Sequence, residues 1–187
     1  DYLERHGFRV RIANLAARMV RSDRFDAEQF IARLRSRAFG IDLHWLPHAH
    51  GALEVARLVR KHHPDVPIIF GGFSATYFHE ELIRYPQVDY VVRGDSTEEP
   101  LRQLMACLRE GREPVDVPNL TWKDAEGRVH VNPQTYLPAD LNHIRPGFRQ
   151  MVRAVIRDRD LLSYAPFSHW LDYPIMATLT VRGCTQH

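Results

Sequence analysis

Three short segments of the sequence combine glycine with imidazole, hydroxyl or carboxylate side chains, and each follows a short apolar run. They are Pro47–Gly51, Gly71–Thr76 and Arg93–Glu99. Glycine lets a ligand approach backbone N–H groups that a side chain would block, and the N–H groups at a helix start favour anions. Ligands of open parallel sheets bind beyond the carboxyl ends of the strands. If the apolar runs are neighbouring strands, the three segments form one rim, which favours a pocket over three ordinary turns or capped helices.

The two cysteines differ in their surroundings. Cys107 lies in the run M-A-C-L beside the apolar stripe of an expected helix, so it is predicted to be a packing residue. Cys184 follows the apolar run I-M-A-T-L-T-V and is preceded by Gly183. A cysteine just past a buried strand is placed at the mouth of a site, and it can be the first of a series that holds an iron-sulfur cluster.

Several histidines raise the question of a metal site, since imidazole is a common metal ligand. They are His44, His48, His50, His62 and His63. One is expected inside a strand and two at the end of a helix, and no cysteine or carboxylate completes a ligand set. We therefore do not predict a metal site from these histidines.

Alternating strands and helices are predicted to position the three segments, because parallel strands need helical crossovers. Gly7 is expected to close a first helix. Strands are expected at Phe8–Leu15, Gly40–Leu46, Ile68–Phe70 and Asp89–Val92. Helices are expected at Asp26–Ala38, Ala52–Lys61 and Phe78–Tyr85, and after a capping box at Ser96–Glu99, with Leu101, Leu104, Met105 and Leu108 on the buried stripe of the last helix.

The pattern changes after Pro114, which divides the chain into three predicted parts. Residues 1–112 form the α/β domain. Residues 113–170 begin with a hairpin around K-D-A-E-G and continue as a proline-rich connector with a short helix at Met151–Arg157. Residues 171–187 contain a new buried strand that runs into Cys184, and both ends of the chain are expected to be cut from a longer protein.

Composition restricts the function further. The 25 basic and 23 acidic residues give a net charge of +2 without a basic block, so no nucleic-acid partner is predicted. No stretch approaches the ~20 apolar residues of a membrane span, and no signal peptide is evident. Two cysteines do not make a disulfide framework, which favours a reducing, cytoplasmic setting.

These motifs resemble those of the cobalamin-binding radical S-adenosylmethionine proteins. The resemblance rests on P-x-x-x-G at Pro47–Gly51, on Gly71-Gly72, on D-Y-V-V, and on Gly94-Asp95 through Glu98. The hairpin resembles the segment between the two domains of that family. V-R-G-C-T-Q-H resembles the end of the first barrel strand, where the family continues as Cys-x-x-x-Cys-x-x-Cys.

The resemblance implies a flavodoxin-like or Rossmann-like sheet that lacks its first strand and holds cobalamin, followed by the start of a radical S-adenosylmethionine barrel. Cys184 would be the first ligand of a 4Fe-4S cluster, and S-adenosylmethionine would bind the cluster. The residues implied to contact the corrin or its nucleotide tail, or to line the same pocket, are His48, Gly51, Gly71, Gly72, Ser74, Thr76, Gly94, Asp95, Ser96 and Glu98. The full-length protein would then be an enzyme that acts on a small molecule, with methyl transfer as a common outcome, and the fragment alone would be inactive.

Two other functions are consistent with the same pattern. One is a cobalamin-sensing module without catalysis, which predicts no cluster cysteines beyond Cys184. The other is a flavodoxin-like nucleotide-binding or signalling domain, in which the Gly71-Gly72 loop holds a phosphate. That domain does not explain the apolar run before Cys184. Substrate and oligomeric state are not predicted.

Overall fold

The computed structural model describes residues 1–140, 142, 148–164, 170 and 172. The expected strand before Cys184, and Cys184 itself, lie outside these residues. The chain divides into two compact units, of which one contains residues 28–138 and the other residues 1–27 and 139–187. Each unit is described separately. Among the described residues, no helix is long and apolar enough to cross a membrane.

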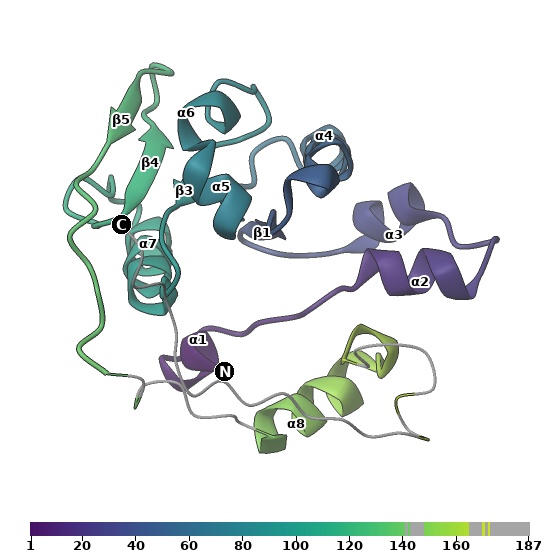
Figure 1. Cartoon of the computed structure of the whole chain (residues 1–187). Coiled ribbons are helices and arrows are strands. Elements are labelled where there is room, and N and C mark those ends of the chain that lie inside the picture. Colours follow the sequence, from purple (N-terminus) through teal and green to yellow (C-terminus); the bar gives the residue numbers. More distant parts are fainter. Residues whose placement is uncertain (141, 143–147, 165–169, 171, 173–187) are drawn as a thin grey trace. The chain divides into compact units, whose positions relative to one another are not determined.

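The larger unit is built on a sheet of five strands in the order β1-β2-β3-β4-β5 (Figure 1). The strands are β1 (Phe39–Asp42), β2 (Ile68–Gly71), β3 (Tyr90–Val92), β4 (Leu120–Lys123) and β5 (Val129–Val131). The first three are parallel, whereas β4 and β5 are antiparallel to their neighbours. The prediction of an α/β sheet is confirmed, and the hairpin extends the parallel strands into a mixed sheet.

Helix α7 (Glu98–Glu110) covers one face of this sheet. Its Leu104 and Cys107 pack with Ile69 of β2 and with Leu120 and Trp122 of β4. The opposite faces of β2 and β3 carry Ile68, Phe70 and Val91, all fully buried. This second face is covered by α4 (Ala49–His62), α5 (Phe73–Tyr77) and α6 (His79–Leu82), which Figure 1 shows on the side of the sheet away from α7. The predicted packing role of Cys107 is confirmed.

The amino side of the sheet is fixed by polar contacts. The Asp89 carboxylate accepts hydrogen bonds from the Ile68 backbone N–H at 2.7 Å and from the Arg60 guanidinium at 2.5 Å. Lys123 of β4 donates to the Tyr85 and Val88 carbonyl oxygens at 2.7 and 2.9 Å. The aspartate of the D-Y-V-V motif therefore has a structural role at the edge opposite to the predicted rim.

The smaller unit contains α1 (Tyr2–Arg5), α2 (Leu15–Arg21), α8 (Phe148–Asp158) and the short 3₁₀ turn η2 (Leu162–Tyr164). Gly7 follows α1 with a φ of +82°, as predicted for the residue after a helix end. Asp160 and Ser163 are buried, and their side chains bond at 2.8 Å. Asp160 also pairs with Arg18 of α2, so a buried polar cluster joins α2 to η2.

The expected strand at Phe8–Leu15 is wrong. Residues 8–14 form no strand, and Leu15 begins α2 because the Asn14 side chain caps that helix by accepting from the Ala17 N–H at 2.9 Å. Alternating apolar residues make a strand only beside a partner ladder, and the described residues offer none to this segment.

Several boundaries also differ from expectation. The strand expected at Gly40–Leu46 is β1 (Phe39–Asp42), so His44 follows the strand and does not lie inside it. The helix expected at Asp26–Ala38 is α3 (Ala27–Arg33), so Gly40 does not close it and lies within β1. The capping box at Ser96–Glu99 does not form, since Thr97 is the N-cap of α7 and makes no side-chain cap bond. Glu99 instead bonds Arg102 and Gln103, one turn further along the helix.

Candidate functional site

The carboxyl ends of three parallel strands lie at one edge of the sheet. Asp42 of β1 is in register with Gly71 of β2, and Phe70 of β2 is in register with Val91 of β3. The segments that follow these strands therefore start side by side. This edge, with the three following segments, is called the rim below.

Gly72 connects β2 to α5 in a backbone conformation that favours glycine, with a φ of +106°. A Cβ atom at this position would lie 2.7 Å from the backbone carbon and oxygen of Leu43 and 2.8 Å from an Asp42 carboxylate oxygen. The missing side chain thus lets the second segment pack against the end of β1. Gly71 is less restricted, because its nearest neighbour would be the Val92 oxygen at 4.0 Å.

The hydroxyl groups of α5 hold the second segment to its neighbours. Ser74 donates from its hydroxyl to the His44 carbonyl oxygen at 3.1 Å, which links the second segment to the chain between β1 and the first segment. Thr76 donates to the Gly72 carbonyl oxygen at 3.0 Å and accepts from the Gly94 N–H at 2.9 Å. Ser74 and Thr76 therefore set the shape of the rim through contacts within the chain.

The third segment begins at a buried arginine. Arg93 is 6% exposed, and its guanidinium donates to carbonyl oxygens of Asn132 and Leu120 in the hairpin. Burial lowers the pKa of Arg93. Gly94 follows with a φ of +119°, and a Cβ there would lie 3.2 Å from the Asn119 side-chain nitrogen. The third segment is thus held against the hairpin on one side and against Thr76 on the other.

The remaining predicted residues belong to the first and third segments. Asp95 and Ser96 lie between Gly94 and α7, whose first residue is Glu98, and Ser96 is buried. His48 ends the 3₁₀ turn η1 (Leu46–His48), and Gly51 lies in α4 with open space around it. In the described part of the chain, no hydrogen bond joins His48 or Gly51 to the other two segments.

The rim also carries exposed apolar side chains that sequence reasoning did not single out. Trp45 is 61% exposed, Phe73 is 49% exposed and Tyr77 is 81% exposed. The His44 ring lies 4.9 Å from Trp45 and 4.5 Å from Phe73, measured between ring centroids. Tyr77 is one helical turn beyond Phe73 on α5. The sequence could have indicated them, because Trp45 shortly precedes the first glycine-containing segment, Phe73 lies within the second and Tyr77 directly follows it.

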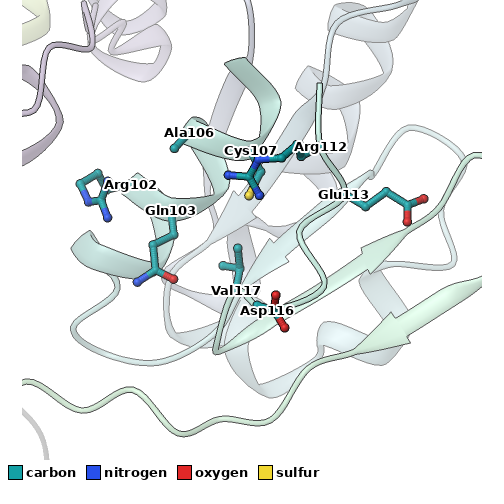
Figure 2. A pocket seen from close by; sticks show the side chains of 8 residues that line it. All are labelled: Arg102, Gln103, Ala106, Cys107, Arg112, Glu113, Asp116 and Val117. Carbon is teal, nitrogen blue, oxygen red and sulfur yellow. The ribbon is translucent and has the colours of Figure 1, made fainter. Parts of the chain in front are cut away.

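A separate hollow of about 290 Å³ lies beside α7 and the segment that leads to β4 (Figure 2). Arg102, Cys107, Arg112 and Asp116 are among its lining residues, and it includes no predicted site residue. Pockets that enclose drug-sized ligands measure about 300–1,000 Å³, so this one cannot enclose a corrin. Among the described residues, no group of three or more histidine, cysteine or acidic residues could hold a metal ion.

The fold is an open α/β sheet whose three parallel strands carry a glycine-shaped, aromatic rim at their carboxyl ends, which is where sheets of this class bind their ligands. The family model of the B12 binding domain matches residues 1–104. The chain therefore belongs to the B12-binding domain family, which confirms the expected resemblance.

Individual proteins support the same relationship. Over 91 residues the chain is 30% identical to the anaerobic magnesium-protoporphyrin IX monomethyl ester cyclase of Synechocystis sp.. The aligned region covers 48% of this chain and 18% of the cyclase. The radical S-adenosylmethionine methyltransferase TsrM of Kitasatospora setae, solved with cobalamin and a 4Fe-4S cluster, is 23% identical to this chain with a TM-score of 0.59. The superposed region covers 74% of this chain and 27% of the TsrM chain.

The cobalamin-dependent S-adenosylmethionine radical enzyme OxsB, with aqua-cobalamin and S-adenosylmethionine bound, is 16% identical with a TM-score of 0.54. The superposed region covers 70% of this chain and 18% of the OxsB chain. The two solved structures show a shared fold. The chain thus spans about a fifth to a quarter of the length of the relatives named.

Proposed function

We propose that the chain binds cobalamin at the rim. The observation that carries this proposal is the exposed aromatic surface of Trp45, Phe73 and Tyr77 on segments joined by Ser74 and Thr76. A contiguous exposed apolar patch with polar groups around it is typical of a ligand site. A corrin offers a broad ring system for such a surface and amide groups for the polar surroundings, so the residues present fit it.

Each group at the rim then has a defined task. Trp45, Phe73 and Tyr77 would bury one side of the ring system and exclude water from it. Gly72 and Ser74 keep the second segment against the end of β1, which fixes the position of α5 and of its aromatic residues. Asp95 and Glu98, at the start of α7, would accept hydrogen bonds from amide groups. Gly71, Gly94, Ser96, His48 and Gly51 complete the proposed lining.

The test is a titration of the chain with hydroxocobalamin, followed by its visible spectrum and by tryptophan fluorescence. We expect a spectral shift, and a loss of affinity of at least tenfold in the variant W45A/F73A. The matched control is Y85A, which removes a 44% exposed aromatic residue before β3, at the opposite edge of the sheet. No shift with hydroxocobalamin, or a shift with flavin mononucleotide in its place, would contradict the assignment.

We further propose that the chain is the cobalamin-binding part of a radical S-adenosylmethionine enzyme. Support comes from the curated relative, the two solved structures and the V-R-G-C-T-Q-H run, in which Cys184 would be the first cluster ligand. When bound, cobalamin together with a 4Fe-4S cluster and S-adenosylmethionine supplies methyl transfer to an unactivated carbon of a small-molecule substrate. The chain's own contribution is to hold the corrin at the rim.

The radical assignment is tested on the encoding DNA and on the full gene product. We expect codons for cysteine at the first position after His187 and again three positions later. We also expect reconstitution with iron and sulfide to give a cluster that the variant C184A does not form. A stop codon or other residues at those positions would contradict the radical assignment and favour a cobalamin-binding module without radical chemistry.

A further inference from the structure

The chain returns to the rim after the hairpin. Residues 133–138, called the strap below, follow β5 and pass the end of β3. Asn119 connects the two, because its N–H donates to the Pro133 carbonyl oxygen at 2.9 Å and its carbonyl oxygen accepts from the Arg93 N–H at 2.7 Å. The strap is thus anchored to the backbone from which the third rim segment begins.

The Asn119 side chain fixes the strap a second time. Its amide oxygen accepts from the Tyr136 N–H at 2.9 Å, and its amide nitrogen donates to the Tyr136 carbonyl oxygen at 3.0 Å. Asn119 is 1% exposed and has a φ of +59°, a left-handed conformation that asparagine tolerates better than most residues. A buried residue with this many backbone partners specifies one path for the strap.

Two strap side chains are near the third segment. A Cβ atom on Gly94 would lie 3.8 Å from the Gln134 side-chain nitrogen, so the Gln134 amide is beside the end of β3. The Asn119 side-chain nitrogen, 3.2 Å from the same Cβ position, donates to the Tyr136 carbonyl oxygen, so Tyr136 also lies beside the third segment. Burial, and then the nearby carboxylates of Glu99 and Glu98, raise the pKa of its phenol. The strap therefore brings Gln134 and Tyr136 to the part of the rim that holds Gly94.

We propose that the strap is a fourth wall of the site and that Gln134 and Tyr136 hydrogen bond to the peripheral amides of the bound corrin. The inference rests on the proposed cobalamin function and adds residues outside the three glycine-containing segments. A glutamine amide and a tyrosine hydroxyl each donate and accept, which suits the primary amides around a corrin. Gly94 has no side chain to stand between these groups and a ligand at the edge of the sheet.

The experiment compares the 187-residue chain with the variants Q134A and Y136F, and with T135A as a control for an exposed strap residue. Each is titrated with hydroxocobalamin and with dicyanocobinamide, which keeps the corrin amides and lacks the nucleotide tail. We expect Q134A and Y136F each to weaken both ligands about 3- to 10-fold, as for one lost hydrogen bond, and T135A to leave both affinities unchanged.

The outcomes separate the two proposals. Binding by the wild type with unchanged affinity in Q134A and Y136F would overturn the strap assignment and leave the cobalamin assignment in place. Weakening of hydroxocobalamin alone would place the contact on the nucleotide tail and overturn the corrin-amide contact. No binding of either ligand by the wild type would overturn both proposals.

A second measurement does not depend on any variant. Hydrogen–deuterium exchange of residues 133–138 should slow when hydroxocobalamin is added, because a wall of the site becomes covered. The hairpin turn at residues 124–128 is the internal control and should exchange at the same rate in both states. Equal exchange of the strap with and without bound ligand would contradict the proposal.

Discussion

The Thr76 hydroxyl accepts a hydrogen bond from the Gly94 N–H at 2.9 Å and thereby joins the segment after β2 to the segment after β3. The same hydroxyl donates to the Gly72 carbonyl oxygen at 3.0 Å, so its donor and one acceptor site are both used within the chain. One side chain thus links two of the three segments that form the proposed cobalamin site.

Replacing Thr76 by valine keeps the shape of the side chain and removes both hydrogen bonds. We expect the free energy of unfolding to fall by about 1–3 kcal/mol, because the Gly94 N–H loses its acceptor. Urea denaturation measures this change, and hydroxocobalamin affinity should fall with it. Thr76→Ser should retain most of the stability. The same change at the exposed Thr135, Thr135→Val, is the control, and equal losses in both valine variants would contradict the linking role of Thr76.

Gly72 and Gly51 should respond in opposite directions to alanine. Gly72→Ala is expected to cost about 3 kcal/mol or more, because the φ of +106° strains any other residue and the new Cβ meets the Leu43 backbone at 2.7 Å. Gly51 lies in helix α4, and a Cβ atom there would meet no other atom within 4 Å. Gly51→Ala should therefore raise the free energy of unfolding by about 0.5–1 kcal/mol. Thermal or urea unfolding of both variants tests the pair, and a shift of the same sign in both would contradict it.

Much of the larger unit could be predicted from local pattern. Ile68–Phe70 is a continuous apolar run and forms the buried strand β2, and Leu104 falls on the helical stripe that packs against the sheet. The pattern at Phe8–Leu15 was equally regular, but a strand also needs a partner ladder and Asn14 offered a helix cap instead. A periodic pattern of apolar residues indicates that one face of a segment is buried. It does not indicate which strand or helix covers that face.

The candidate site was predicted in part. Glycines at 72 and 94 marked the turns, because their positive φ values are a local property of the backbone. The strap could not be predicted, since Asn119 reaches Tyr136 across 17 positions and only the folded hairpin sets that distance. Trp45 and Phe73 could equally have been core residues, and their exposure depends on packing that the sequence alone does not specify.

The buried cluster of the smaller unit should make the chain sensitive to acid. Burial of Asp160 alone would raise its pKa, but hydrogen bonds from Arg18 and Ser163 outweigh burial and leave the pKa below its ordinary value. The stabilisation is therefore present above the ordinary carboxyl pKa of about 3.9 and is lost as the pH falls through the lowered value. Asp160→Asn should cost about 2–3 kcal/mol at pH 7, because Arg18 loses its ion-pair partner.

Urea denaturation at pH 7 and at pH 3 measures this dependence. The difference in stability between the two pH values should be smaller in Asp160→Asn than in the wild type. The control is Asp116→Asn, which removes an exposed carboxylate of the larger unit. An identical pH dependence in the wild type and Asp160→Asn would show that this carboxylate does not contribute.

Two ion pairs of the larger unit should differ strongly in their contribution to stability. The Asp89 carboxylate accepts from Arg60 and also from the N–H of Ile68, a fully buried residue of β2. Asp89→Ala leaves that N–H without its acceptor, so we expect a loss of about 2 kcal/mol. Glu54 and Arg57 form a pair whose side chains are 47% and 55% exposed, and Glu54→Ala should leave the free energy of unfolding almost unchanged.

Asp89→Asn distinguishes the two contacts of Asp89. The asparagine oxygen can still accept from the Ile68 N–H, whereas the charge that attracts Arg60 is gone. We therefore expect Asp89→Asn to fall between the wild type and Asp89→Ala in urea denaturation, and its residual loss to shrink at high salt. If Asp89→Asn is as unstable as Asp89→Ala, the ion pair with Arg60 carries the effect and the bond to the β2 backbone does not.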